Sequence, residues 1–223
     1  MTRGLQCFQH SNQSHFVTFS CYRRLPLFAS PELFDLFVRS LEEMRRRFEI
    51  LIYGYVVMPE HVHLLMSEPE VVALAEAIHF LKLSFAKKTR GLCSVASQVG
   101  APKIRASCGK GSERGANLGH EVNPLACSGH AMRYEASESF WQKRYHDRNV
   151  RDYREFKAKL RYLHRNPVKR GLVKDPSEWR WSSFRHYALQ EVGVVEIESE
   201  WTARDREGGR KGRVFLLPKV GPG

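Results

Sequence analysis

The sequence has no long hydrophobic run, few acidic side chains relative to basic ones, and no paired cysteine motif. No stretch approaches about 18 uninterrupted apolar residues, and the first residues, MTRGLQCFQHSNQSHF, lack the apolar core of a signal peptide. Membrane insertion and export are therefore not expected. The five cysteines include no C-x-x-C pair, which argues against a disulfide framework and a thiolate zinc site. A cytoplasmic, nucleoid-associated protein is expected.

Charge and length point to a partner class. The 36 Lys and Arg outnumber the 24 Asp and Glu and give a net charge of +12, with a pI near 9.7. Such a field favours a polyanion, and nucleic acid is the first candidate. A chain of 223 residues with 42% apolar content is long enough for one domain with its own core.

The first half of the chain has the periodicity of a small α+β domain. Strands are expected at 15–22, 50–57 and 61–66, and amphipathic helices at 31–47 and 71–90. Ser30 followed by Pro31 is a helix-start signal, and Pro59 with Glu60 makes the turn between the second and third strands. The order β-α-β-β-α predicts a ferredoxin-like or RRM-like antiparallel sheet with helices packed on one face.

The second half is interrupted before it becomes regular again. Residues 91–137 hold seven of the sixteen glycines and no periodic pattern, so they are expected to form a disordered insertion within one domain at 14–190. A fourth strand is expected at 140–145, then a third helix that is capped by Asp152 and stops by Asn166 because Pro167 follows. A short helix is expected in the aromatic segment 179–187, before a tail at 191–223.

Two histidines on the third strand are candidate metal ligands. Residues two apart on a strand project to the same face, so His61 and His63 would present their rings together while Val62 points into the opposite layer. Two imidazoles can share a divalent ion if further ligands complete its shell. With ten histidines in the chain, however, an H-x-H spacing arises by chance in roughly four of ten such sequences. The spacing alone leaves both interpretations open.

A tyrosine on the third helix lies off its apolar face. Tyr153, Phe156, Leu160 and Leu163 fall within an arc of about 80° and predict a buried stripe, whereas Tyr162 lies roughly 140° from its centre. Asn166 follows one turn later and can meet Tyr162. The alternative is an exposed tyrosine whose neighbour only caps the helix end.

Positive charge is concentrated around this tyrosine. Residues 143–170 contain eleven basic and three acidic side chains, which is +8 of the total +12, and this favours contact with phosphates. The side chains predicted to bind DNA are Lys143, Arg144, Arg148, Arg151, Lys159, Arg165, Lys169 and Arg170.

Four segments together resemble one known family. The sequences MPEHVH at 58–63, FWQKRY at 140–145, YLHRNPVKRG at 162–171 and WRWSS at 179–183 are similar to those of REP-associated tyrosine transposases, the bacterial single-tyrosine relatives of insertion-sequence HUH transposases. The similarity covers about residues 14–90 and 138–190. It implies the HUH endonuclease fold, His61 and His63 as metal ligands, Tyr162 as the nucleophile and Asn166 as a polar third ligand.

The resemblance also implies a reaction and its partners. With Mg²⁺ or Mn²⁺ bound, Tyr162 would attack a phosphate of single-stranded or hairpin DNA, such as a repetitive palindromic element, and form a 5′-phosphotyrosine with a free 3′-hydroxyl. The protein would be a monomer or a homodimer and would not associate with a membrane.

Two alternatives remain. A non-catalytic module, or a decayed transposase, would bind single strands on an RNA-recognition-like sheet without cutting them. A metal-dependent nuclease would use the histidines to activate water and would leave Tyr162 incidental.

Overall fold

The computed structural model describes residues 13–98 and 139–209, and a four-stranded antiparallel sheet lies at its centre. The strands are β1 (Ser14–Ser20), β2 (Ile52–Val57), β3 (His61–Ser67) and β4 (His146–Val150), in the spatial order β2-β3-β1-β4. Every neighbouring pair is antiparallel. With β1 and β3 in the middle, this is the order of a ferredoxin-like sheet, and the predicted fold class is confirmed.

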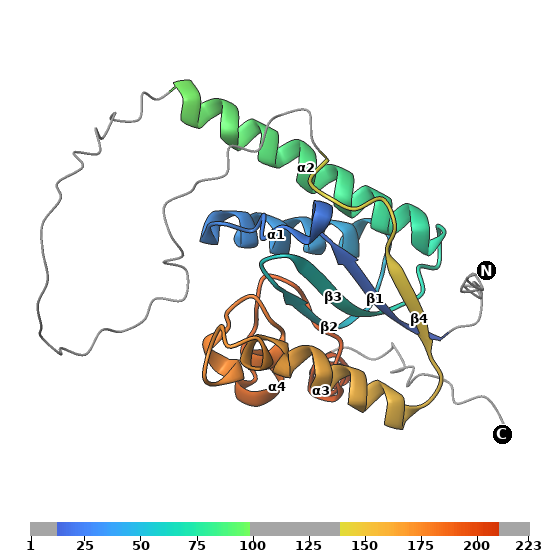
Figure 1. The fold of residues 1–223 in the computed structure, drawn as a ribbon. Coiled ribbons are helices and arrows are strands. Elements are labelled where there is room, and N and C mark those ends of the chain that lie inside the picture. Colours follow the sequence, from blue (N-terminus) through green and yellow to red (C-terminus); the bar gives the residue numbers. More distant parts are fainter. Residues whose placement is uncertain (1–12, 99–138, 210–223) are drawn as a thin grey trace, which may run out of the picture.

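Helices lie on both sides of this sheet. Helices α1 (Pro31–Arg47) and α2 (Leu74–Gln98) cover one face, and α3 (Tyr153–Lys169) and α4 (Phe184–Leu189) lie against the other (Figure 1). The described chain also has two short 3-10 helices, η1 (Tyr22–Arg24) and η2 (Pro176–Glu178), and ends in α5 (Glu200–Gly209). The prediction placed helices on one face only. Helix α3 on the second face is an addition to that arrangement, and it lies beside β3.

The core lies between the sheet and helices α1 and α2. Along α1, buried apolar residues recur every three or four positions, as in Phe34, Phe37 and Leu41, and they pack on the β1 side chains that point the same way, such as Phe19. No described helix is long and apolar enough to span a bilayer.

The fourth strand begins further along the chain than predicted. Residues 140–145 contain only an isolated bridge from Trp141 to Cys21, because the rings of Phe140 and Trp141 are buried against Phe28 and Phe85. Regular pairing with β1 begins at His146 and is supported by a buried hydrogen bond, 3.0 Å long, between His15 Nδ1 and an Asp147 carboxylate oxygen. The prediction of a strand at 140–145 was therefore wrong by about one strand length.

The third helix begins where predicted and ends later. Asp152 caps it by accepting a hydrogen bond from the Glu155 amide at 2.7 Å, but the helix continues through Pro167 to Lys169 instead of stopping by Asn166. The stop is at Gly171, whose φ of 68° suits glycine. The amides of Gly171 and Leu172 bond to the carbonyls of Val168 and Pro167, which is a Schellman ending.

The predicted insertion and the predicted tail are only partly described. Helix α2 continues past residue 90 to Gln98, and residues 99–137 lie outside the described residues. In the aromatic segment, the helix covers only Phe184–Leu189, while Ser182 bridges to Val56 at the edge of β2.

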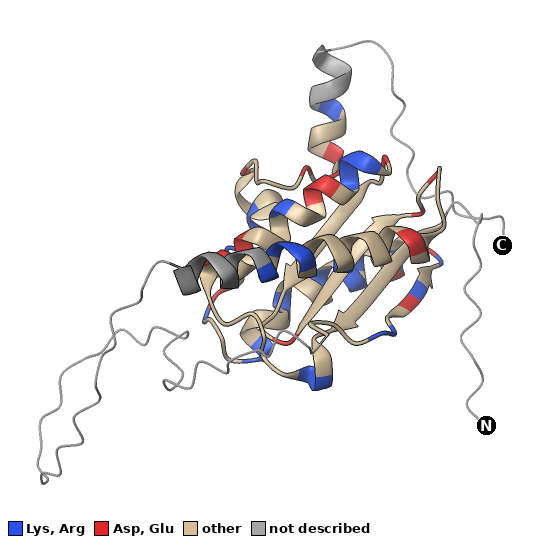
Figure 2. Cartoon of the chain, turned by 90° about the horizontal axis from the view of Figure 1, so that it is seen from above, with Lys and Arg blue, Asp and Glu red and all other residues tan. Residues whose placement is uncertain are grey.

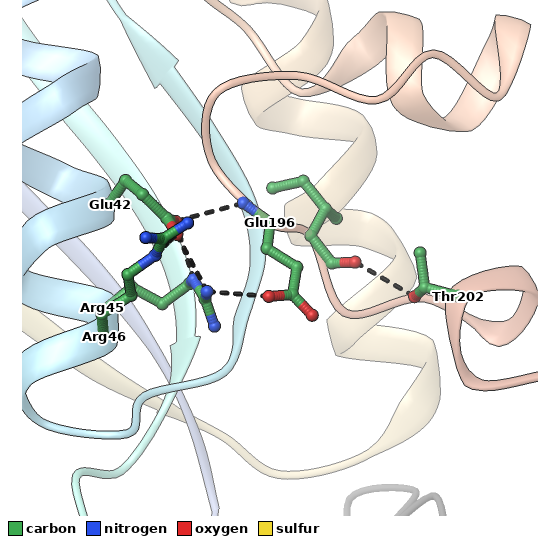
Figure 3. Close-up of polar contacts among 6 residues, drawn as sticks. Glu42, Arg45, Arg46, Glu196 and Thr202 are labelled. Carbon is green, nitrogen blue, oxygen red and sulfur yellow. Dashed lines mark hydrogen bonds and ion pairs between the residues drawn. The ribbon is translucent and has the colours of Figure 1, made fainter. Parts of the chain in front are cut away.

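A polar network holds part of the segment after residue 190 on α1. The buried carboxylate of Glu42 accepts hydrogen bonds from Arg45, Arg46 and the Glu196 amide, and Arg45 also pairs with the Glu196 carboxylate at 2.7 Å (Figure 3). Burial acts to raise the pKa of Glu42, but the bonds from the two arginines outweigh it and lower the pKa. Residues 195–199 are thereby fixed beside β2.

The close approach of α3 to the sheet depends on Gly54 of β2. A Cβ at this position would lie 2.7 Å from Leu160 Cδ1 and 3.4 Å from Leu163 Cδ2, both on α3. We expect Gly54→Val to displace α3 and lower the free energy of unfolding by about 1–3 kcal/mol. The measurement is urea unfolding, with Gly193→Val as control, since a Cβ at Gly193 meets nothing closer than 4.0 Å. Equal losses in the two variants would contradict this account of the packing.

Candidate active site

His61 and His63 converge on one point between the sheet and α3. They lie two residues apart on β3, while the intervening Val62 is fully buried in the opposite layer. Their Nε2 atoms are 3.0 Å apart. Two ligands at about 2.1 Å from one ion, on neighbouring coordination positions, are themselves separated by about 3 Å, so the spacing fits a shared divalent ion.

The other ring nitrogen of each histidine has a polar neighbour. His63 Nδ1 lies 2.7 Å from Thr18 Oγ1, and Thr18 stands directly opposite His63 in the β1–β3 pairing. His61 Nδ1 lies 3.3 Å from Glu60 Oε1. A carboxylate can only accept, so a proton on His61 Nδ1 would face Glu60 and leave the Nε2 lone pair directed toward His63. Polar groups placed behind imidazoles in this way orient metal-binding histidines.

The surroundings favour the neutral form of both imidazoles. Burial, helped by the charges of His61 and Lys159, lowers the pKa of His63 to about 3. Burial also lowers the pKa of His61, although the charge of Glu60 acts in the opposite direction. Neutral imidazole is the form that binds a metal ion, so the local environment favours the ligand state of both rings.

Tyr162 lies beside this pair. Its ring centroid is 5.4 Å from that of His63 and 6.0 Å from that of Phe16, in edge-to-face arrangements. The Lys169 ammonium lies 5.5 Å from the centre of the Tyr162 ring. The side chain remains 43% exposed, so a large substrate can reach its hydroxyl. The structure thus brings together three of the four predicted central residues.

Asn166 is less directly connected. It is buried one turn after Tyr162, and its side-chain nitrogen has no hydrogen-bond partner among the described residues. None of the hydrogen bonds of those residues joins it to His61 or His63. Residues 13–98 and 139–209 also contain no cluster of three His, Cys, Asp or Glu side chains suited to a metal ion. Among the described residues, a further ligand for an ion held by the two histidines would be an amide such as Asn166, with water or substrate completing the shell.

Two residues of this site were not assigned from the sequence. Thr18 carries no local signal, because only the pairing register places it against His63. Glu60 was interpreted as a turn residue, yet it contacts His61 and also accepts a hydrogen bond from Arg170, just beyond the end of α3. Glu60 thus links the histidine strand to the tyrosine helix.

The predicted DNA-binding side chains lie on β4 and α3 and on the residues that flank them. Lys159 is half-buried, with its ammonium 4.9 Å from the centre of the Phe16 ring, and the other seven are exposed. Two of them are paired with acids: Arg148 with Glu155, and Arg170 with Glu60. On the opposite side of the molecule, seen in Figure 2, basic and acidic residues are intermixed. His164, which the sequence left unassigned, is buried and bonds Ser183 Oγ at 2.9 Å.

Residues 8–96 match the family model described as "Transposase IS200 like". These residues belong to the IS200-like transposase family. The matched segment includes His61 and His63, whereas Tyr162 lies beyond it. The family recognised from sequence motifs is confirmed.

Two individual proteins are similar to this chain. One, from Haemophilus influenzae, is named as a REP-associated tyrosine transposase and is 26% identical over 137 residues, which are 61% of this chain and 60% of the relative. The match therefore spans less than two thirds of the relative's length. The other is a solved structure of a REP-associated tyrosine transposase bound to a REP hairpin, with a TM-score of 0.54 and 18% identity over 89% of this chain and 93% of that one. At this identity the second match shows a shared fold.

Proposed function

We propose that this IS200-like transposase cuts and rejoins single strands of DNA through a covalent tyrosine intermediate. The observation that carries the proposal is the placement of Tyr162, from a helix on one side of the sheet, against the converging pair of His61 and His63. A solvent-accessible phenol beside neutral imidazoles is suited to nucleophilic attack on a phosphate.

Each step can be assigned to bonds and residues. The Tyr162 oxygen forms a bond to phosphorus and loses its proton, the bond from phosphorus to the 3′ oxygen breaks, and that oxygen leaves as a hydroxyl. A divalent ion, held by His61 and His63 with Asn166 as a further ligand, would supply charge that stabilises the phosphate oxygens in the transition state. Lys169 adds a positive charge next to the tyrosine ring. Later attack by a 3′-hydroxyl reverses the steps and joins two strands without ATP.

The substrate follows from charge and from relatives. The net charge of +12 and the exposed cations of α3 and β4 favour DNA, and the solved relative is bound to a REP hairpin. We propose hairpin DNA with single-stranded flanks as the substrate.

The direct test is a search for the covalent product. Purified protein is incubated with end-labelled hairpin oligonucleotides and Mn²⁺ or Mg²⁺, then separated on a denaturing gel. We expect a slowly migrating protein–DNA band that requires the ion and disappears after protease treatment. Free cleavage products without that band would support a hydrolytic nuclease, and intact DNA with retained binding would support a binding module. Either result would overturn the proposal.

Glu60 should affect ion binding through His61. Outer-shell partners of metal-binding histidines typically contribute 10- to 100-fold in affinity, so we expect Glu60→Ala to weaken Mn²⁺ binding by about that factor. Titration calorimetry of the protein without DNA gives the dissociation constant. Glu43→Ala is the control, because it also removes a paired carboxylate, one that contacts Lys88 away from the histidines. An unchanged constant in Glu60→Ala would exclude this positioning effect.

A further inference from the structure

Four cations on α3 form a ridge that ends at Tyr162. Lys157, Arg161, Arg165 and Lys169 are spaced four residues apart, so each step advances about 6 Å along the axis and turns by about 40°. The ridge therefore winds from the side of α3 next to η2 and α4, across its outer side, toward Tyr162. Its last member, Lys169, is the residue whose ammonium lies over the Tyr162 ring.

A pocket lies alongside the first three residues of this ridge. It has a volume of about 460 Å³ and is lined by three ridge residues and by side chains from α3, η2 and α4, a size typical of small-ligand sites. Leu160, Pro176 and Phe184 supply apolar lining. The Tyr187 hydroxyl is already used in a hydrogen bond to the Tyr53 carbonyl. The pocket therefore offers mainly ring and methyl surface, with cations at its rim.

The rim charges are available to a ligand. Among the described residues, no ion pair includes Lys157, Arg161 or Arg165, and all three are exposed. A second cavity of about 520 Å³, between α1 and residues 191–197, differs in this respect. There, Arg180 pairs with Asp35 and Arg185 pairs with Glu191. Of the two cavities, the one beside α3 is the better match to a polyanion.

We propose that this pocket binds one unpaired nucleobase of the DNA strand and that the ridge holds the phosphates between that base and Tyr162. A flat apolar lining with an aromatic ring suits the face of a base, and unpaired arginines suit the phosphates on either side of it. The ridge is about 18 Å long, so the base lies within about five nucleotides of the scissile phosphate. The inference rests on the proposed function, because it takes the bound base and the scissile phosphate from the same DNA strand.

The test asks whether the effect of removing one DNA base depends on the Phe184 ring. All proteins carry Tyr162→Phe, so that DNA binds without reacting, and the DNA is a labelled hairpin with single-stranded flanks and one abasic site at each of five flank positions in turn. We expect one position at which the abasic site weakens binding by about 5- to 100-fold. With Phe184→Leu added, that penalty should fall below about twofold. Phe184→Tyr keeps the ring and should retain the penalty.

Salt dependence tests the ridge. We expect Arg161→Ala and Arg165→Ala each to reduce the slope of log K against log salt concentration by about 0.7. The control is Arg39→Ala, an exposed arginine on α1, which should leave the slope unchanged. If no abasic position depends on Phe184, or if Arg39→Ala lowers the slope as much as Arg161→Ala, the proposed base site is wrong. Melting temperatures confirm that each variant is folded.

The two proposals fail separately. The covalent band is measured with the unsubstituted protein, whereas base binding is measured in the Tyr162→Phe background. A covalent band without any Phe184-dependent position would overturn only the base pocket. A Phe184-dependent position without a covalent band would support the pocket and overturn the strand chemistry.

Discussion

Tyr162→Phe is expected to lower the yield of the covalent protein–DNA product by at least about 1000-fold. The substitution removes only the hydroxyl, so the ring keeps its contacts with Phe16, His63 and Lys169. Because the side chain is 43% exposed, the free energy of unfolding should change by no more than about 0.5 kcal/mol. DNA affinity should also be retained. Product yield is measured on a denaturing gel, and affinity by fluorescence anisotropy.

Tyr153→Phe is the matched control for this variant. Tyr153 lies on the same helix and has the same 43% exposure, but its ring contacts Phe156 and Lys157 rather than the histidines. It should give full product yield. A covalent band that persists in Tyr162→Phe would assign the nucleophile to another residue.

His61→Ala and His63→Ala are each expected to lower product yield by at least about 100-fold and to weaken Mn²⁺ binding. If the two rings hold one ion, either substitution destroys the same site, so the double variant should be little worse than the poorer single one. Product yield and calorimetric Mn²⁺ titration measure the two effects independently. The control is His79→Ala, an exposed histidine on α2, which should change neither.

Independent effects would contradict a shared ion. If the losses in the two single variants multiply in the double variant, the histidines act separately. If product still forms in the double variant with a chelator present, the chemistry does not need the pair.

The sequence predicted the elements whose signals are local. The Ser30–Pro31 helix start, the Asp152 cap and the alternation that puts His61 and His63 on one face each depend on a few neighbouring residues, and the structure has all three. The off-stripe position of Tyr162 is also local, since it follows from helical phase alone.

Signals that depend on distant partners were missed or misjudged. Phe140 and Trp141 have strand-like composition, but their rings pack in the aromatic cluster around Phe28 and Phe85. The strand therefore begins only at His146. Pro167 is the predicted stop signal in the sequence, whereas in the structure the proline is buried within the helix, which stops at Gly171. Tyr153, predicted in the buried stripe, is exposed because it begins the helix at the sheet's edge.

The candidate site shows the same division. The residues predicted for it share motifs, while Thr18 reaches His63 only through the register of β1 against β3. Asn166 was placed near Tyr162 by helical spacing, and its assignment as a metal ligand stays a prediction.

Strand β3 bonds to a neighbour on each side and contributes alternate residues to two different layers. This arrangement has an evolutionary consequence. Any insertion or deletion that slipped β3 by one position would turn both imidazoles into the apolar layer and expose Val62 and Leu64 in their place. The histidine pair therefore cannot shift to the other face while the domain persists, so within this lineage loss of the proposed chemistry with retained folding should come from point substitutions rather than from changes in strand length.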